Sequence, residues 1–113
     1  SRAATALDNP VNEARAADKP ALVAFSSAGC CGPDEVAPLL NAVRGKWDEA
    51  LSIVYIDAAS DPVLAARYNV RTVPTLIVYD KQGEETARWN RVVGLDVLAE
   101  EFKEAGIESG GTH

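Results

Sequence analysis

The sequence contains no methionine, only two cysteines and a single histidine among its 113 residues. The missing methionine leads us to expect that a leader was removed or that the chain was cut from a longer protein. The cysteines, Cys30 and Cys31, are adjacent. A disulfide between them would enclose almost no chain, which excludes a fold stabilised by disulfides within the chain. The histidine, His113, is the last residue, and we therefore expect no closed metal site and no cofactor.

Long apolar runs and an excess of basic residues are also missing. No run approaches the ~20 residues of a membrane-spanning helix, so we expect no membrane insertion. Seventeen acidic residues against eleven basic ones give a net charge of −6, which argues against nucleic acid as a partner. The 47% of hydrophobic and 25% of charged residues are typical of one soluble globular domain, which we expect to be monomeric. A bacterial-type cytoplasm and a periplasm both fit as its compartment.

Apolar patterns predict helices and strands that alternate along the chain. We expect an N-terminal segment with an opening helix at 1–18, a single domain at 19–106 and a disordered tail at 107–113. Within the domain, strands are predicted at 21–25, 51–56, 76–79 and 86–93, and helices at 34–47, from Asp61 onward and at 95–105. This order predicts an α/β fold, with a mixed central sheet flanked by helices on both faces.

Local signals refine three of these elements. In the helix that begins near Asp61-Pro62, Val63, Leu64, Ala66 and Tyr68 are available for packing. The turn at residues 80–83 ends in a glycine that can take a positive φ. Another glycine, at position 106, follows the last helix and is expected to end it.

Two stretches of the sequence carry a resemblance to a known family. A strand that ends in Phe25 leads into the loop Cys30-Cys31-Gly32-Pro33, which precedes a helix that contains Pro38. Further along, Val73-Pro74-Thr75 opens a strand, and the hairpin that follows ends in Gly94 ahead of the last helix. In this order and spacing, the chain resembles the thioredoxin family from about residue 19 to residue 106.

The resemblance implies a thioredoxin fold that acts on protein thiols and disulfides. It implies that Pro74 is a cis-proline facing the cysteine loop. The residue before it, Val73, would offer backbone groups to an extended substrate chain, and the loop residues Gly32 and Pro33 would also contact substrate.

The family's usual spacing of two residues between its cysteines is lost here. Counting from Phe25 and back from Pro38 puts Cys30 at the place of the attacking thiol and Pro33 at the place of the resolving one. Reading the letters Cys-Gly-Pro literally makes Cys31 the nucleophile instead. We prefer the first register, because core packing holds Phe25 and Pro38 in place. Both registers lack the ordinary resolving cysteine.

Adjacent cysteines limit the chemistry of the site. Their Cα atoms are ~3.8 Å apart across a trans peptide, below the ~4.4–6.8 Å that a disulfide normally spans. A bridge between Cys30 and Cys31 would therefore be strained and easily reduced. The pair can be interpreted as a vicinal redox couple, as a single attacking thiol released by an outside thiol, or as soft-metal ligands that need further partners.

Two hypotheses for the function follow. The first is a thioredoxin-like thiol–disulfide oxidoreductase in which Cys30 attacks and Cys31 assists or resolves. The alternative is a redox-inactive thioredoxin-fold module that binds proteins or acts as a chaperone. The alternative is favoured by Ala24 and Ile53, which stand where the family has a buried acid and a lysine that move protons during resolution.

Overall fold

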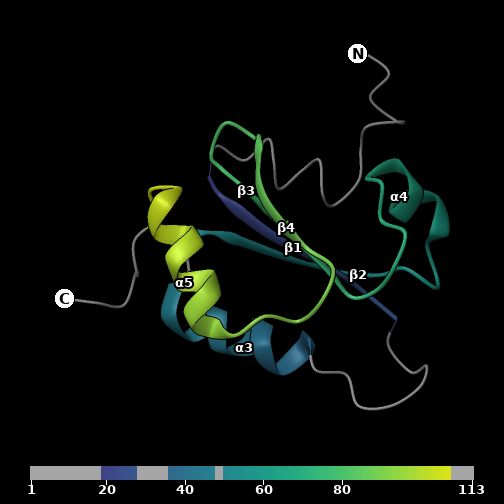
Figure 1. The fold of residues 1–113 in the computed structure, drawn as a ribbon, viewed down its shortest axis with the longest axis horizontal. Helices are drawn as coiled ribbons and strands as arrows, with labels where there is room; N and C mark the ends of the chain where they lie inside the picture. The colour runs from purple at the N-terminus through teal and green to yellow at the C-terminus, as the bar shows by residue number, and fades with distance from the viewer. Residues whose placement is uncertain (1–18, 28–35, 48–49, 108–113) are drawn as a thin grey trace.

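The structure, a computed structural model, describes residues 19–27, 36–47 and 50–107. The elements follow one another as β1 (Ala21–Ser26), α3 (Val36–Trp47), β2 (Ser52–Asp57), α4 (Pro62–Arg67), β3 (Thr75–Tyr79), β4 (Glu85–Trp89) and α5 (Leu95–Glu104) (Figure 1). The predicted alternation of strands and helices is confirmed. The predicted opening helix and the tail at 108–113 lie outside the described residues.

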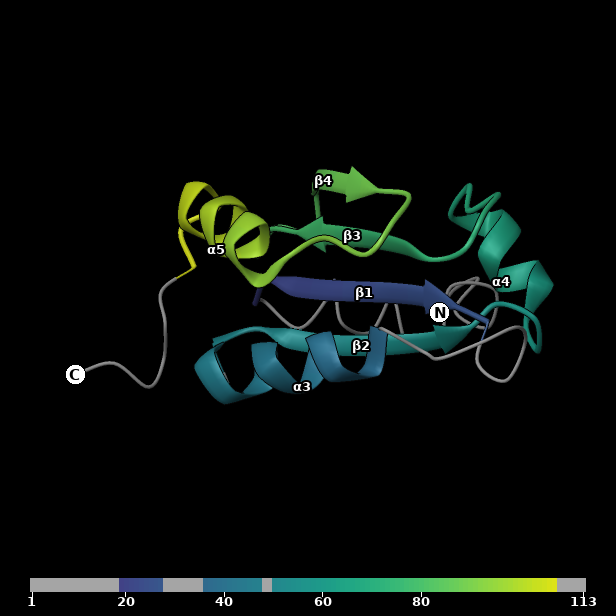
Figure 2. The same cartoon turned by 60° about the horizontal axis from the view of Figure 1, so that its bottom comes forward.

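The four strands form one mixed sheet in the order β2-β1-β3-β4, and Figure 2 shows them side by side in this order. β1 runs parallel to β2, and β3 is antiparallel to both β1 and β4. All six residues of β1 are buried, because the strand lies in the middle of the sheet with packed side chains on both faces. Its continuous apolar run is the pattern expected of such a strand.

Helices cover both faces of the sheet, as predicted. Alternate residues of β1 point to opposite faces. Leu22 and Ala24 belong to a core cluster with the buried side chains of α3 and α5. Val23 and Phe25 belong to a second cluster, with the buried side of α4. The first cluster includes an edge-to-face pair of rings, Trp47 of α3 and Phe102 of α5, whose centroids are 4.8 Å apart.

The packing of α4 differs from the prediction. Val63 is 69% exposed and Ala66 is exposed, whereas Leu64 and Ala65 are buried. The helix has only six residues, and it contacts the sheet through a narrow stripe of buried side chains. Its start agrees with the prediction, since the carboxylate of Asp61 accepts a hydrogen bond from the N–H of Leu64 at 3.3 Å.

Two other boundaries also differ from those predicted. β4 ends at Trp89, because the chain leaves the sheet there, rather than continuing to residue 93. Ile107, which the sequence assigned to the tail, is 5% exposed and donates a backbone hydrogen bond to the carbonyl of Phe102 at 2.8 Å. The two glycine turns are as expected, since Gly83 and Gly106 both have a φ of 84°.

Candidate functional site

The sheet register brings two distant parts of the chain to the same end of the fold. Phe25 near the end of β1 pairs with Thr75 at the start of β3. Residues that enter β3 therefore lie beside the point where β1 leads into the cysteine segment. The four loop residues predicted for the site, Cys30, Cys31, Gly32 and Pro33, lie outside the described residues.

The loop before β3 contains the other two predicted site residues. The peptide bond between Val73 and Pro74 is cis, as the resemblance implied. Val73 is 41% exposed, and the hydrogen bonds recorded for the described residues include none to its backbone N–H or C=O. This loop thus presents an apolar side chain at the end of the sheet where β1 ends, with backbone groups that no described residue bonds.

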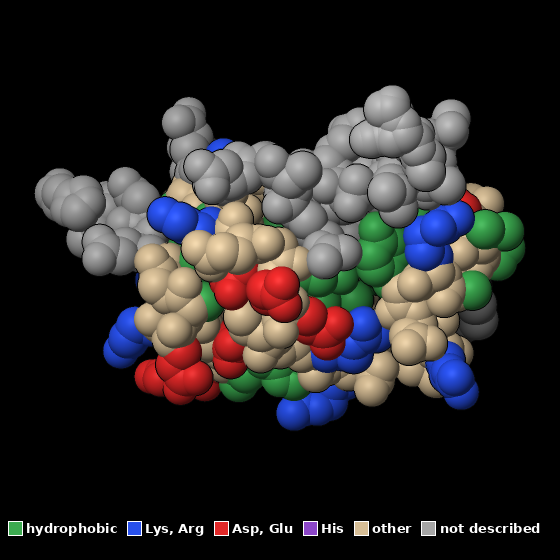
Figure 3. Space-filling model, turned by 90° about the horizontal axis from the view of Figure 1, so that it is seen from above, with side chains coloured by type: hydrophobic (Ala, Val, Ile, Leu, Met, Phe, Trp, Pro, Cys, Tyr) green, Lys and Arg blue, Asp and Glu red, His purple; other side chains and the backbone are tan. Residues whose placement is uncertain are grey.

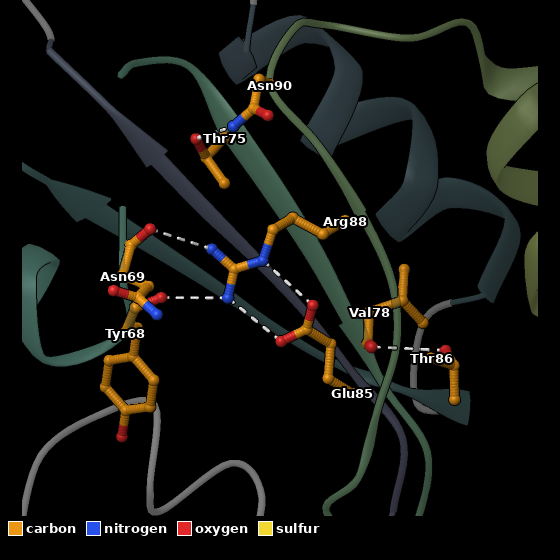
Figure 4. A network of polar contacts seen from close by, with 8 residues as sticks. All are labelled: Tyr68, Asn69, Thr75, Val78, Glu85, Thr86, Arg88 and Asn90. Atoms are coloured by element: carbon orange, nitrogen blue, oxygen red, sulfur yellow. Dashed lines mark hydrogen bonds and ion pairs between the residues drawn. The ribbon is translucent and has the colours of Figure 1, made fainter. Parts of the chain in front are cut away.

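A buried hydroxyl anchors the end of this loop. The side chain of Thr75 is fully buried, and its Oγ1 donates a hydrogen bond to the carbonyl of Thr72 at 2.7 Å. The same oxygen accepts a hydrogen bond from Nδ2 of Asn90 at 3.2 Å (Figure 4). Both capacities of the hydroxyl are used, so no buried polar atom is left unsatisfied there.

An arginine anchors the chain just before the loop. The guanidinium of Arg88 donates from Nη2 to the carbonyl of Tyr68 at 2.9 Å and from Nη1 to the carbonyl of Asn69 at 3.3 Å. It also forms an ion pair with Glu85, in which Nε and Nη2 each lie 3.0 Å from a carboxylate oxygen (Figure 4). The hydrogen bond with Glu85 raises the pKa of Arg88 above its ordinary value. Arg88 is therefore a cation held rigidly against the C-terminal end of α4, where carbonyl groups favour positive charge.

Sequence reasoning missed Arg88, Asn90 and Thr75. Arg88 lies 20 residues from Tyr68, and Asn90 lies 15 residues from Thr75. No periodic pattern or short motif connects positions at such separations.

The two positions at which the resemblance implies proton-transfer groups are apolar in the structure. Ala24 is fully buried in the core cluster beneath α3, and Ile53 packs against the same cluster. Neither side chain can accept or donate a proton. The described residues supply no replacement for the missing acid and lysine at these two positions.

A hollow of about 350 Å³ lies beside Arg88. Its lining includes Arg67 and Arg88 together with Glu84 and Glu85. Both signs of charge line it, so its electrostatics select neither an anion nor a cation, and we assign it no ligand.

The described residues form neither a metal site nor a membrane-spanning helix. In these residues, no three His, Cys, Asp or Glu side chains come together to hold a metal ion. None of the described helices is both long and apolar enough to cross a membrane. On the face shown in Figure 3, the described Lys and Arg side chains are interrupted by acidic and other side chains rather than forming one continuous basic patch.

Comparison with known proteins gives a consistent result. The family model for Thioredoxin matches residues 3–104. A thioredoxin from Porphyra purpurea is 36% identical over 78 residues, which cover 68% of each chain. A thioredoxin from Staphylococcus epidermidis is 40% identical over 66 residues, which are 58% of this chain and 60% of that protein. The structure of oxidised thioredoxin O2 from Arabidopsis thaliana superposes with a TM-score of 0.70 over 92% of this chain and 90% of that one, at 19% identity, and so shares the fold.

Proposed function

The chain belongs to the thioredoxin family, and we propose that it is a thiol–disulfide oxidoreductase in which Cys30 is the attacking thiol. The single observation that carries this proposal is the pairing of Phe25 with Thr75. This pairing sets the exposed Val73 beside the end of β1 that leads to the cysteines. An attacking thiol in the segment that follows β1 would then lie close to a platform for an extended substrate.

The first chemical step is an exchange of sulfur partners. The thiolate of Cys30 attacks one sulfur of a protein disulfide, the substrate S–S bond breaks, and the second substrate sulfur leaves as a thiolate that takes up a proton. A mixed disulfide between Cys30 and the substrate remains. Helix α3 is described from Val36 onward, five residues after the second cysteine, and the positive end of its dipole would stabilise a thiolate in the segment before it.

The second step releases the substrate. The thiolate of Cys31 attacks the sulfur of Cys30, the mixed disulfide breaks, and the substrate leaves with its second thiol. Two electrons have then passed from the cysteine pair to the substrate, and an external thiol reductant restores the pair. Strain in the Cys30–Cys31 bridge makes attack by Cys31 less favourable. An external thiol can therefore also attack the mixed disulfide and release the substrate directly from Cys30. The apolar Ala24 and Ile53 leave proton transfer in this step to solvent, so we expect release to be slow.

Substrate would bind along the loop before β3. Its extended backbone would pair with the N–H and C=O of Val73, beside Pro74 and across from Gly32 and Pro33. Main-chain pairing of this kind favours unfolded or extended segments over particular side-chain sequences.

Insulin reduction by dithiothreitol tests the proposal with matched serine variants. We expect Cys30→Ser to abolish catalysis and Cys31→Ser to retain the attack but to accumulate mixed disulfide. Activity lost only in Cys31→Ser would assign the nucleophile to the other register. An inactive parent protein would contradict the oxidoreductase proposal. The vicinal bridge is tested separately by mass spectrometry, as a loss of about two mass units, the two thiol hydrogens, on oxidation of the pair.

A second candidate, a redox-inactive binding module, is favoured by the apolar Ala24 and Ile53. It predicts that the variant with both cysteines changed to serine binds unfolded polypeptide as tightly as the parent. Calorimetric titration with a reduced, unfolded protein measures this. Binding that disappears in the double variant would contradict the binding module.

A further inference from the structure

The loop that carries Val73 and Pro74 has few attachments of its own. At its start, Val70 is 9% exposed and its N–H donates to the carbonyl of Ala65 at 2.8 Å. The next three residues are exposed. The chain becomes buried again only at Thr75. A loop of this kind needs contacts from outside itself to hold one conformation.

Within the described part of the chain, one short stretch makes two side-chain contacts with this loop and the residues beside it. Arg88 lies in β4 and bonds the two carbonyls that precede the loop, those of Tyr68 and Asn69. Asn90 lies just past the end of β4 and bonds the hydroxyl of Thr75, which in turn bonds the carbonyl of Thr72 inside the loop. In Figure 4 the contact between Asn90 and Thr75 lies apart from the contacts of Arg88 with Tyr68 and Asn69.

The stretch that makes these contacts is itself well fixed. Ile77 pairs with Arg88 and Leu76 pairs with Trp89 in the β3–β4 ladder. Glu85 holds the guanidinium of Arg88 through two hydrogen bonds, a bidentate geometry that fixes orientation. The side chain of Arg88 therefore has little freedom to follow the loop, and Asn90 follows directly on the paired residue Trp89.

From these contacts we infer that Arg88 and Asn90 are positioning residues, which hold the Val70–Pro74 loop in the conformation that receives an extended substrate. Arg88 holds the backbone just before the loop. Asn90 holds the end of the loop through its hydrogen bond to Thr75. Neither residue touches the reacting sulfurs in this role. The substrate half of the inference rests on the proposed function, whereas the ordering of the loop does not.

The test compares four variants of the full chain. Arg88→Met keeps the aliphatic stem and removes the guanidinium, and Asn90→Ala removes the amide. Arg91→Met is the matched control, because Arg91 is an exposed arginine of the same segment. Arg88→Lys is the conservative variant, which can restore one of the two bonds to carbonyls.

The first measurement needs no substrate. Backbone ¹⁵N relaxation gives order parameters for residues 71–73, which we expect to fall toward about 0.6 or below in Arg88→Met and Asn90→Ala. They should stay at the parent value in Arg91→Met and recover partly in Arg88→Lys. Unchanged order parameters in both test variants would overturn the inference. Asn90 is exposed, so its variant should fold even if Arg88→Met does not.

The second measurement is insulin reduction with KM and kcat separated. We expect KM to rise about 3- to 10-fold in the two test variants, because substrate binding would then have to order a loop that has lost the free energy of about one hydrogen bond. The rate of alkylation of the thiols by iodoacetamide should not change. A loop that becomes mobile while KM stays at the parent value would overturn the substrate role. An inactive parent would remove both the proposed function and that role, while the relaxation data would still decide whether the two residues order the loop.

Discussion

Replacement of Phe102 by alanine is expected to be among the most destabilising single changes in this protein. The side chain is fully buried, and its ring packs edge-to-face on Trp47 with an angle of 80° between the ring planes. The pair joins α5 to the last turn of α3, the helix that follows the cysteine segment. The buried strands behind it cannot move into the space that the ring would leave, so the cavity should stay open.

The size of the effect follows from the contacts that are lost. Phenylalanine-to-alanine changes in cores cost about 3–5 kcal/mol, and the open cavity places this one near about 4 kcal/mol. With a denaturant slope of about 2 kcal/mol per molar urea, the unfolding midpoint should fall by about 2 M. The ring pair itself should appear as a coupling of about 0.5–1.5 kcal/mol in a double-mutant cycle with Trp47→Leu.

The assay is equilibrium unfolding in urea, followed by far-ultraviolet circular dichroism. Tryptophan fluorescence is unsuitable, because the substitution changes the surroundings of Trp47 directly. Val97→Ala is the control on the same helix, since Val97 is 37% exposed, and it should change stability by less than about 0.5 kcal/mol. If Phe102→Ala fails to fold, Phe102→Leu should still give a measurable loss of about 1–2 kcal/mol. A loss below about 1 kcal/mol in Phe102→Ala would refute the reasoning.

Four further predictions concern α3, the end of α5, the start of α4 and the loop before β3. Gly45→Ala should stabilise the protein by about 0.5–1 kcal/mol, because Gly45 lies inside a helix with nothing within 4 Å of an added Cβ. By contrast, Gly106→Ala should cost about 1–2 kcal/mol, because its φ is +84°; urea unfolding measures both, and equal effects would contradict this account. Asp61→Ala should cost about 1 kcal/mol through loss of the N-cap of α4, and Asp61→Asn much less, in the same assay. Val73→Asp should raise the KM for insulin about 5- to 10-fold with little change in stability, whereas Val63→Asp, at a site that is 69% exposed, should change neither.

Local chemistry was enough to predict most of the elements. The continuous apolar run that became β1 needs water excluded from both of its faces, and a central strand of a mixed sheet is the simplest place that provides this. Asp61-Pro62 predicted the start of α4, and Gly83 predicted a turn with positive φ, because each of these residue types meets a backbone requirement without help from distant parts of the chain.

Other features depended on how the elements met. Val63 seemed available for packing, yet it is exposed, because α4 touches the sheet through too narrow a stripe to include it. Ile107 looked like part of a polar tail, yet its side chain is buried in a core cluster. The sequence pattern indicates which residues of a helix are apolar. It does not indicate how much of the apolar face of the helix the adjoining sheet will cover.

At the candidate site, the amino-acid sequence by itself determined the fold family, the two adjacent cysteines, the apolar Ala24 and Ile53, and the proline before β3. Only the tertiary structure decided that Arg88 and Asn90 hold the two ends of the loop with that proline. The physical reason is that a hydrogen bond between residues 15 to 20 positions apart has no local signal. It exists only after strand register has brought β4 beside the end of α4 and the start of β3.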